Sequence, residues 1–315
     1  MEGLHSKHSM IRGGEGQSFG TFGELLQGVG SNGDDFLVTL PIQRYAVAKF
    51  IHHPSMREIM VSPSTKKKSM ALTLLILNHY GIEPGGILEI KGEIPIGKGL
   101  ASSSADLVAT VRALDDCFGF NFTPEQIQFF LKQVEPTDGV MYEGVVSFYH
   151  RKVQLREFLG QLPPLTILGI DEGGEVDTVE FNKLPKRFSD GEKQIYDELL
   201  DTLSHAVRTG DIHTIGVVST QSARMNQKIR QNKFFHDVMS ICEKVRGLGI
   251  VIAHSGTFIG ILLSPERVDY WNQISAASEA MQELDGDVMI FHSWSADQKS
   301  IVPGRKNTIN GQPLV

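Results

Sequence analysis

The sequence predicts an α+β protein with two domains, on three observations. The chain has 315 residues, which is long enough for two domains of ordinary size. Strand-like and helix-like segments alternate through the first half. Residues 161–164 contain two adjacent prolines, which fit poorly into either kind of element and suit a linker. We therefore expect a first domain over residues 1–162 and a second over residues 163–315.

The first half contains both hydrophobic periodicities. Residues 87–94 alternate between apolar and polar side chains, which indicates a half-buried strand. Thr123 followed by Pro124 is a typical helix start. In chain order we expect strands at 36–40 and 44–51 joined by a turn at Pro41, a helix at 66–80, the strand at 87–94, a helix at 106–114 with serines at its start, a helix from 124 to 134 and a strand at 143–150.

The second half is rich in amphipathic helices. Residues 165–170 form an apolar run short enough for a buried strand. We then expect helices at 191–208, 211–229 and 233–248, strands at 250–253 and 258–263, a helix at 265–284 and a last strand at 287–292.

The composition is that of an ordinary soluble globular protein, and we expect a cytoplasmic location. Hydrophobic residues make up 41% and charged residues 21% of the chain, and the net charge of -7 argues against non-specific nucleic-acid binding. Two cysteines far apart suggest reduced thiols. Residues 1–15 lack the apolar core of a signal peptide, and the longest apolar run, residues 70–77, is too short to cross a bilayer.

Residues 95–106 predict a phosphate-binding loop. Glycines at 97 and 99 let backbone N–H groups approach a ligand, and serines at 102–104 stand where the next helix begins, as capping residues do. A helix N-terminus is a ready anion site. Taken alone, the same residues also fit an ordinary serine-capped helix that follows a glycine turn.

The loop also begins like a Walker A motif, because Gly92 is followed after four residues by Gly97 and Lys98. That motif then requires serine or threonine to bind magnesium, and this chain has Gly99. Since the hydroxyl groups come three residues later, we interpret the segment as a different kind of phosphate loop.

The order Pro-x-x-x-Gly-Leu-x-Ser-Ser-x-Ala resembles the phosphate-binding motif of the GHMP kinases. Two further blocks agree: GTFGELLQG at residues 20–28 resembles the family's first motif, where a Gly-Glu pair follows the first strand, and AHSGT at residues 253–257 stands where the family has its third. The resemblance implies the two-domain GHMP-kinase fold, with a ribosomal-protein-S5-domain-2-like first half and a ferredoxin-like second half. It places the active site in the cleft between the halves.

A narrower resemblance is to the L-threonine kinase branch, carried by the first block, by EPTDGVM at residues 135–141, and by the third block. Galactokinase and mevalonate kinase have several consecutive glycines where Thr257 follows Gly256 here. The resemblance implies ATP-dependent phosphorylation of L-threonine to O-phospho-L-threonine, a precursor of the aminopropanol linker of cobalamin. Homoserine kinase, another small hydroxy-acid kinase, and a sensor that binds nucleotide without turnover remain alternatives.

The resemblance also implies roles for individual residues. Ser103 and Glu135 would hold Mg²⁺, and Asp138 would act as the base or orient the hydroxyl, with a low pKa because metal and phosphates lie close to it. Acidic residues at a helix C-terminus, such as Glu135, also suit a cation. The residues expected to bind the ATP phosphates are Pro95, Gly97, Lys98, Gly99, Leu100, Ala101, Ser102, Ser103 and Ser104.

An amino-acid acceptor needs a partner for its ammonium group and donors for its carboxylate. We expect Thr21, Glu24 and Gln27 to hold the ammonium or hydroxyl, and Arg224 to supply the donors. His254 and Ser255 would close the site, since no Gly-x-Ser-x-Gly elbow makes them a hydrolase pair. The histidines lack zinc-site spacing. The expected ligands are thus ATP, Mg²⁺ and a small hydroxy amino acid, with neither nucleic acid nor membrane as a partner, and a homodimer stays open.

Overall fold

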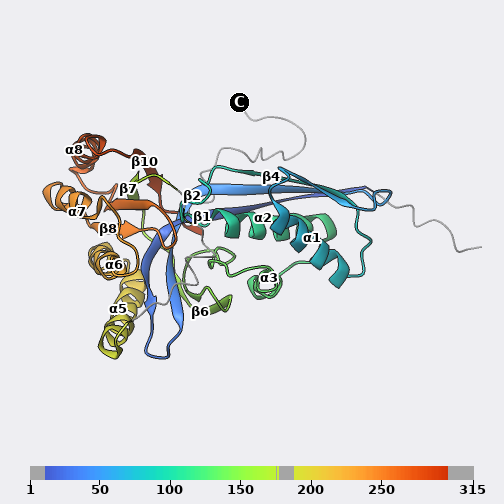
Figure 1. The fold of residues 1–315 in the computed structure, drawn as a ribbon, viewed down its shortest axis with the longest axis horizontal. Helices are drawn as coiled ribbons and strands as arrows, with labels where there is room; N and C mark the ends of the chain where they lie inside the picture. The colour runs from blue at the N-terminus through green and yellow to red at the C-terminus, as the bar shows by residue number, and fades with distance from the viewer. Residues whose placement is uncertain (1–10, 175, 177–187, 297–315) are drawn as a thin grey trace, which may run out of the picture.

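The computed structural model describes residues 11–174, 176 and 188–296, whose strands form one sheet (Figure 1). Eight strands follow one another in the order β10-β7-β9-β8-β1-β2-β4-β3, while β5 pairs with β2 and β6. The strands are β1 (Arg12–Val29), β2 (Asp35–His52), β3 (Ile59–Ser62), β4 (Gly86–Gly92), β5 (Val145–Tyr149), β6 (Gln154–Gly160), β7 (Thr166–Asp171), β8 (Gly249–Ile252), β9 (Phe258–Leu263) and β10 (Asp287–His292).

Seven described helices accompany the sheet: α1 (Lys67–His79), α2 (Ser102–Phe118), α3 (Pro124–Leu131), α5 (Asp190–Thr209), α6 (Ile212–Asn226), α7 (Phe235–Lys244) and α8 (Tyr270–Gln282). In Figure 1, α1, α2 and α3 lie along one side of the long strands, whereas the last four helices gather around the other end. No helix in the described part of the chain is long and apolar enough to cross a membrane.

The long antiparallel pair β1 and β2 is the centre of the fold. β2 continues through Pro41, so the turn expected there is wrong. The register of the pair shifts between Phe19 and Gly20 and again after Thr21, and Pro41 pairs with Thr21 between these two irregularities. A proline without a backbone N–H is tolerated in a strand at such a bulge. The Gly-Glu pair also lies within β1, not after a first strand.

Helix α2 lies directly on this strand pair, which fixes the position of its N-terminus. A Cβ atom on Gly16 would lie 2.3 Å from the carbonyl oxygen of Ala109, and one on Gly14 would lie 2.3 Å from that of Ala113. The two glycines of β1 therefore let the helix approach the backbone of the strand. Ala109 and Ala113, which make this contact, are fully buried.

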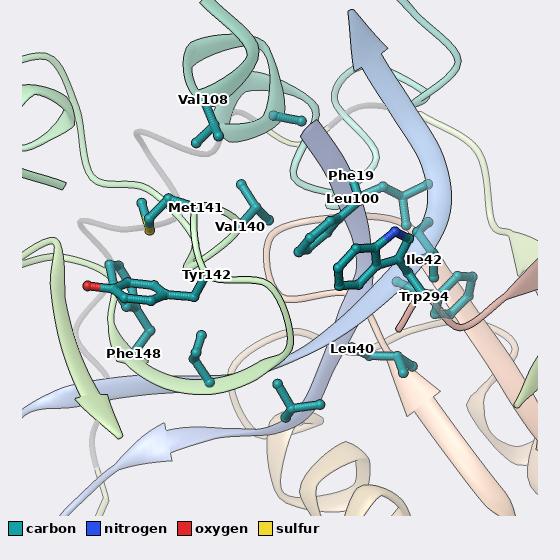
Figure 2. Packing of buried hydrophobic residues seen from close by; sticks show 14 of the residues in the cluster. Phe19, Leu40, Ile42, Leu100, Val108, Val140, Met141, Tyr142, Phe148 and Trp294 are labelled. Carbon is teal, nitrogen blue, oxygen red and sulfur yellow. The ribbon is translucent and has the colours of Figure 1, made fainter. Parts of the chain in front are cut away.

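The two halves of the chain share both the sheet and the core. β8 joins β1 where Ile252 pairs with Glu24. Near the end of the described chain, Trp294 stacks on Phe19 of β1 with ring centroids 4.4 Å apart (Figure 2). Strands β7, β9, β8 and β10 and the last helices thus continue the first half without a break in the sheet. The division at residue 162 stays a prediction.

Most expected elements are present with small changes at their ends. Thr123 forms a full capping box with Gln126 at the start of α3, as its sequence predicts. The last strand has the expected bounds, and α8 begins five residues later than expected. Three strands were not predicted. β3 and β6 are short and mostly exposed on at least one side, so their apolar patterns are weak. β1 is rich in glycine, which is depleted in strands, so its sequence did not indicate one.

Candidate active site

A cavity of about 710 Å³ brings distant parts of the chain together. One wall is the start of α1, and another is the loop that leads into α2. The remaining lining comes from the segment after α3, the end of β5, β1 and the loop between β8 and β9. The lining residues are Glu24, Thr65, Lys66, Lys67, Lys68, Ser69, Ile96, Gly97, Gly99, Leu100, Ala101, Ser102, Ser103, Ser104, Asp106, Leu107, Glu135, Pro136, Thr137, Asp138, His150, Arg151, His254 and Ser255.

The phosphate loop turns through three residues with positive φ before α2 begins. Gly97 has φ 72°, Gly99 has φ 74°, and Ala101 has φ 60° and precedes the first helical residue. Ala101 is therefore the cap, and the three serines lie inside the first turn without a side-chain capping bond. The expectation of serine caps is wrong, and its consequence is chemical: two of the hydroxyl groups bond carboxylates of another segment instead.

The three motif segments touch one another through glycines. A Cβ atom on Gly256 would lie 1.9 Å from the carbonyl oxygen of Lys98, and one on Gly99 would lie 2.7 Å from the Cα of Gly256. On the other side, a Cβ atom on Gly23 would lie 2.2 Å from the carbonyl oxygen of Ile252. The phosphate loop, the β8–β9 loop and the bulge of β1 can meet so closely only because these positions lack side chains.

Ser103 and Glu135 form one of two hydroxyl–carboxylate contacts in the cavity. Ser103 Oγ donates a hydrogen bond to Glu135 Oε1 over 2.5 Å. The other carboxylate oxygen of Glu135 pairs with the ammonium group of Lys68 at the start of α1. Hydroxyl and carboxylate oxygens are the hard ligands that magnesium prefers.

Ser104 and Asp138 form the second contact. Ser104 Oγ donates to Asp138 Oδ2 over 3.2 Å and accepts from the backbone N–H of Asp138 over 3.1 Å. Burial raises the pKa of Asp138 to about 6, although the bond from Ser104 opposes the rise and the charge of Glu135 adds to it. In the protein alone, burial outweighs the hydrogen bond, and the low pKa expected beside metal and phosphates stays a prediction for the loaded site.

The segment after Asp138 anchors this carboxylate in the core. Val140 and Met141 are almost fully buried, and they lie between α2 and Tyr142 (Figure 2). The backbone N–H of Thr137 donates to the carbonyl oxygen of His150 over 3.3 Å. The hydrogen bond of Thr137 before Asp138 and the buried side chains after it fix the position of the Asp138 backbone. A group that orients a hydroxyl or accepts its proton needs such a fixed position.

Several predicted residues do not reach the cavity. Lys98 turns away to form an ion pair of 2.6 Å with Asp171 and a hydrogen bond of 2.7 Å to the carbonyl oxygen of Gly174. Its predicted contact with phosphate therefore has no support from its side-chain position. Arg224 is exposed on α6, and neither it nor Pro95 or Thr21 belongs to the lining.

Gln27 lies behind His254 and not in the lining. The Nδ1 atom of His254 and Oε1 of Gln27 are 2.7 Å apart, and the amide nitrogen of Gln27 donates to the carbonyl oxygen of Ile252 over 3.4 Å. This second bond orients the amide so that its oxygen accepts a hydrogen bond from Nδ1–H of His254. Gln27 therefore orients His254, which does line the cavity together with Glu24 and Ser255.

The cavity contains charged residues that the motifs do not include. Lys66 pairs with Asp106 over 2.5 Å, and burial raises the pKa of Asp106 while Lys66 opposes the rise. His150 and Arg151 follow β5 and line the opposite wall. The basic run at residues 66–68 was a visible signal for the first group. An ordinary His-Arg-Lys sequence after a strand carries no signal for the second.

Comparison with known proteins gives one matching family description and several related enzymes. The family description "GHMP kinases N terminal domain" matches residues 67–144, the segment from α1 to the turn after Asp138. Residues 67–144 thus match the N-terminal domain of the GHMP kinases. It is 24% identical to an L-threonine kinase from Salmonella typhimurium over 252 residues, which cover 78% of this chain and 82% of the relative.

Two further comparisons place this GHMP-family kinase among related enzymes. It is 23% identical to a homoserine kinase from Clostridium botulinum over 222 residues, which cover 65% of this chain and 71% of the relative. The crystal structure of a homoserine kinase from Cytophaga hutchinsonii superposes with a TM-score of 0.71 at 17% identity, covering 93% of this chain and 98% of that one. The predicted α+β GHMP-kinase fold is therefore confirmed.

Proposed function

We propose that this GHMP-family kinase transfers the γ-phosphoryl group of ATP to the side-chain hydroxyl of a small amino acid, L-threonine foremost. One observation carries the proposal. Two consecutive serines at the start of α2 bond the two carboxylates of one turn, Ser103 to Glu135 and Ser104 to Asp138, within a single cavity. Phosphoryl transfer depends mainly on positioning and charge neutralisation, and this arrangement offers both.

The phosphates of ATP would lie against the loop from Gly97 to Ser104. Its backbone N–H groups and the positive end of the α2 dipole favour an anion there. Ser103 and Glu135 would hold Mg²⁺, which when bound neutralises phosphate charge. In the described part of the chain no three acidic, histidine or cysteine residues gather as a metal cluster. The pair suffices, because magnesium keeps water and substrate phosphate oxygens as its other ligands.

Asp138 would orient the acceptor hydroxyl and accept its proton as the bond to phosphorus forms. The carboxylate lines the cavity, and Ser104 holds one of its oxygens. A pKa of about 6 is useful for this task, since the group is then mostly ionised at neutral pH and still basic enough to take a proton. Glu24, buried in the same lining, would pair with the ammonium group of the amino acid.

L-Threonine is the favoured acceptor because the match to an L-threonine kinase spans more of the chain than the match to a homoserine kinase. The first, middle and third sequence blocks favour the same branch. Homoserine kinase is the second candidate, supported by that relative and by the superposed structure. A nucleotide-binding sensor without turnover is the alternative of another class.

The test is a screen for ADP release with ATP, magnesium and single amino acids. We expect release with L-threonine, less with L-serine and homoserine, and none above background with L-alanine, which lacks a hydroxyl. A clear preference for homoserine would move the assignment to the second candidate. Tight nucleotide binding without release for any acceptor would favour the sensor.

A further inference from the structure

The cations of the cavity divide into two groups. Lys66 and Lys68 belong to the start of α1 and pair with Asp106 and Glu135, at the end of the cavity assigned to metal and phosphate. Arg151 reaches the cavity from the opposite direction, after β5. It is the only arginine that the lining includes among residues 11–174, 176 and 188–296.

A chain of contacts connects the segment of Arg151 with the acceptor-side residues. The backbone carbonyl oxygen of its neighbour His150 accepts a hydrogen bond from the backbone N–H of Thr137, next to Asp138, over 3.3 Å. The ring of His150 meets the ring of His254 edge to face at 5.0 Å, and His254 is bonded to Gln27 on β1, three residues from Glu24. Arg151 therefore enters the cavity beside His150, on a segment bonded to the turn of Asp138, and not beside the paired lysines of α1.

Arg151 is also held in position. Its guanidinium nitrogen Nη1 lies 3.2 Å from Asp35 Oδ2 at the start of β2, and the Asp35 side chain is only 12% exposed. A guanidinium group has five N–H donors in a fixed plane, so one ion pair leaves donors that can bind a second carboxylate with two parallel bonds. The Arg151 side chain is 38% exposed, so it stays accessible to a ligand.

We propose that Arg151 binds the α-carboxylate of the amino-acid acceptor, across the cavity from the ammonium partner Glu24. This inference rests on the proposed function and replaces Arg224, which is exposed on α6 outside the lining. An acceptor with both charges then fits one orientation, in which the side-chain hydroxyl faces Asp138. Arg151 is thus a specificity residue that selects amino acids over simple amino alcohols.

The test compares L-threonine with (R)-1-amino-2-propanol, which keeps the ammonium and hydroxyl groups and lacks the carboxylate. The wild-type protein should prefer threonine in kcat/KM by about 10- to 100-fold, the usual effect of hydrogen bonds to a charged group. Arg151→Gln should lose that preference by raising the KM for threonine, with activity on the amino alcohol and the KM for ATP unchanged. Arg151→Lys, which keeps the positive charge, should retain part of the preference for threonine that Arg151→Gln loses.

Two further arginine variants complete the experiment. Arg156→Gln, an exposed position on β6 outside this lining, serves as the matched control and should behave like wild type. Three results would overturn the inference: equal losses on both acceptors in Arg151→Gln, an unchanged preference in Arg151→Gln, or a lost preference in Arg224→Gln. If the wild-type protein itself phosphorylates neither acceptor nor any other hydroxy amino acid, the proposed function fails, and this inference fails with it.

Discussion

Ser103 Oγ lies 2.5 Å from Glu135 Oε1 and joins the first turn of α2 to the segment after α3. The next residue, Ser104, makes the parallel link to Asp138. Because adjacent side chains on a helix point in different directions, two adjacent serines can hold two carboxylates apart while both face one cavity. One carboxylate is thereby available for a metal and the other for the acceptor hydroxyl.

Ser103→Ala and Glu135→Gln should each lower the affinity of the proposed site for magnesium without unfolding the protein. Even outer partners of a bound metal typically contribute 10–100-fold in affinity or activity, so loss of a direct ligand should raise the magnesium concentration needed for half-maximal turnover at least about tenfold. A magnesium titration of turnover measures this. Ser275→Ala on the exposed face of α8 is the matched control. Full activity of both variants at limiting magnesium would show that these ligands are wrongly assigned.

Asp138→Asn should lower turnover by ~10²–10⁴-fold, the usual range for loss of a general base. Only the ionised carboxylate can accept a proton, so wild-type kcat/KM for ATP should fall as the pH drops through about 6. Bound metal favours the ionised form of Asp138, and bound phosphates favour its neutral form. The pH at which kcat falls can therefore differ from the pH at which kcat/KM falls. A loss below about threefold, with unchanged ATP binding, would leave Asp138 as a turn residue only.

The same substitution should stabilise the fold at neutral pH. The folded pKa of about 6 lies above the ordinary 3.8, so the folded state holds the proton more tightly than the unfolded chain. The free energy of unfolding should therefore fall as the pH rises from about 4 to about 6 and remain lower above that range. Because Asp138 is partly exposed, we expect Asp138→Asn to recover ~1–2 kcal/mol at pH 7, less than the full linkage value.

Denaturant unfolding at pH 7 and at pH 3.5 measures this difference. The advantage of Asp138→Asn should be present at pH 7 and nearly absent at pH 3.5, where both states hold the proton. Asp201→Asn, at an exposed position on α5, is the control. Equal stability of Asp138→Asn and wild type at both pH values would show that burial imposes no penalty on this carboxylate.

Gly256→Ala should separate the β8–β9 loop from the phosphate loop. The added Cβ would lie 1.9 Å from the carbonyl oxygen of Lys98, which is backbone and cannot rotate away. We expect a loss of ~1–3 kcal/mol in the free energy of unfolding, the usual result of overpacking, together with a higher KM for ATP. Gly191→Ala on α5, where an added Cβ meets nothing within 4 Å, should change neither. An unaltered KM for ATP in Gly256→Ala would contradict the close contact.

Local chemistry was sufficient to predict many of the elements. Thr123 with Pro124 marks the start of α3, and the apolar runs of β7 and β9 mark buried strands. Pro41 was misjudged because a bulge, which depends on the partner strand, makes room for it. The serines of α2 were misjudged because Ala101 takes the left-handed cap position that glycine or asparagine usually occupies.

The site was predictable where a motif defines it and not where tertiary packing does. The motifs led to Ser103, Glu135 and Asp138, which the fold brings into one cavity. Arg151 and Lys98 show the limit. Arg151 enters the cavity because β5 pairs with β2, and Lys98 leaves it because Asp171 of β7 lies beside the loop. Both facts depend on contacts between segments far apart in the sequence.

The most direct test of the central claim is to identify the product formed from ATP, magnesium and L-threonine. Phosphorus NMR with proton correlation should show phosphate on the side-chain oxygen of threonine, with ADP formed in equal amount. Since one methyl group in an apolar pocket is worth only ~1–3 kcal/mol, serine should react at a ~10–200-fold disadvantage in kcat/KM, and homoserine should be worse still. ADP formed without a phosphorylated amino acid, or no ADP beside tight nucleotide binding, would contradict the account.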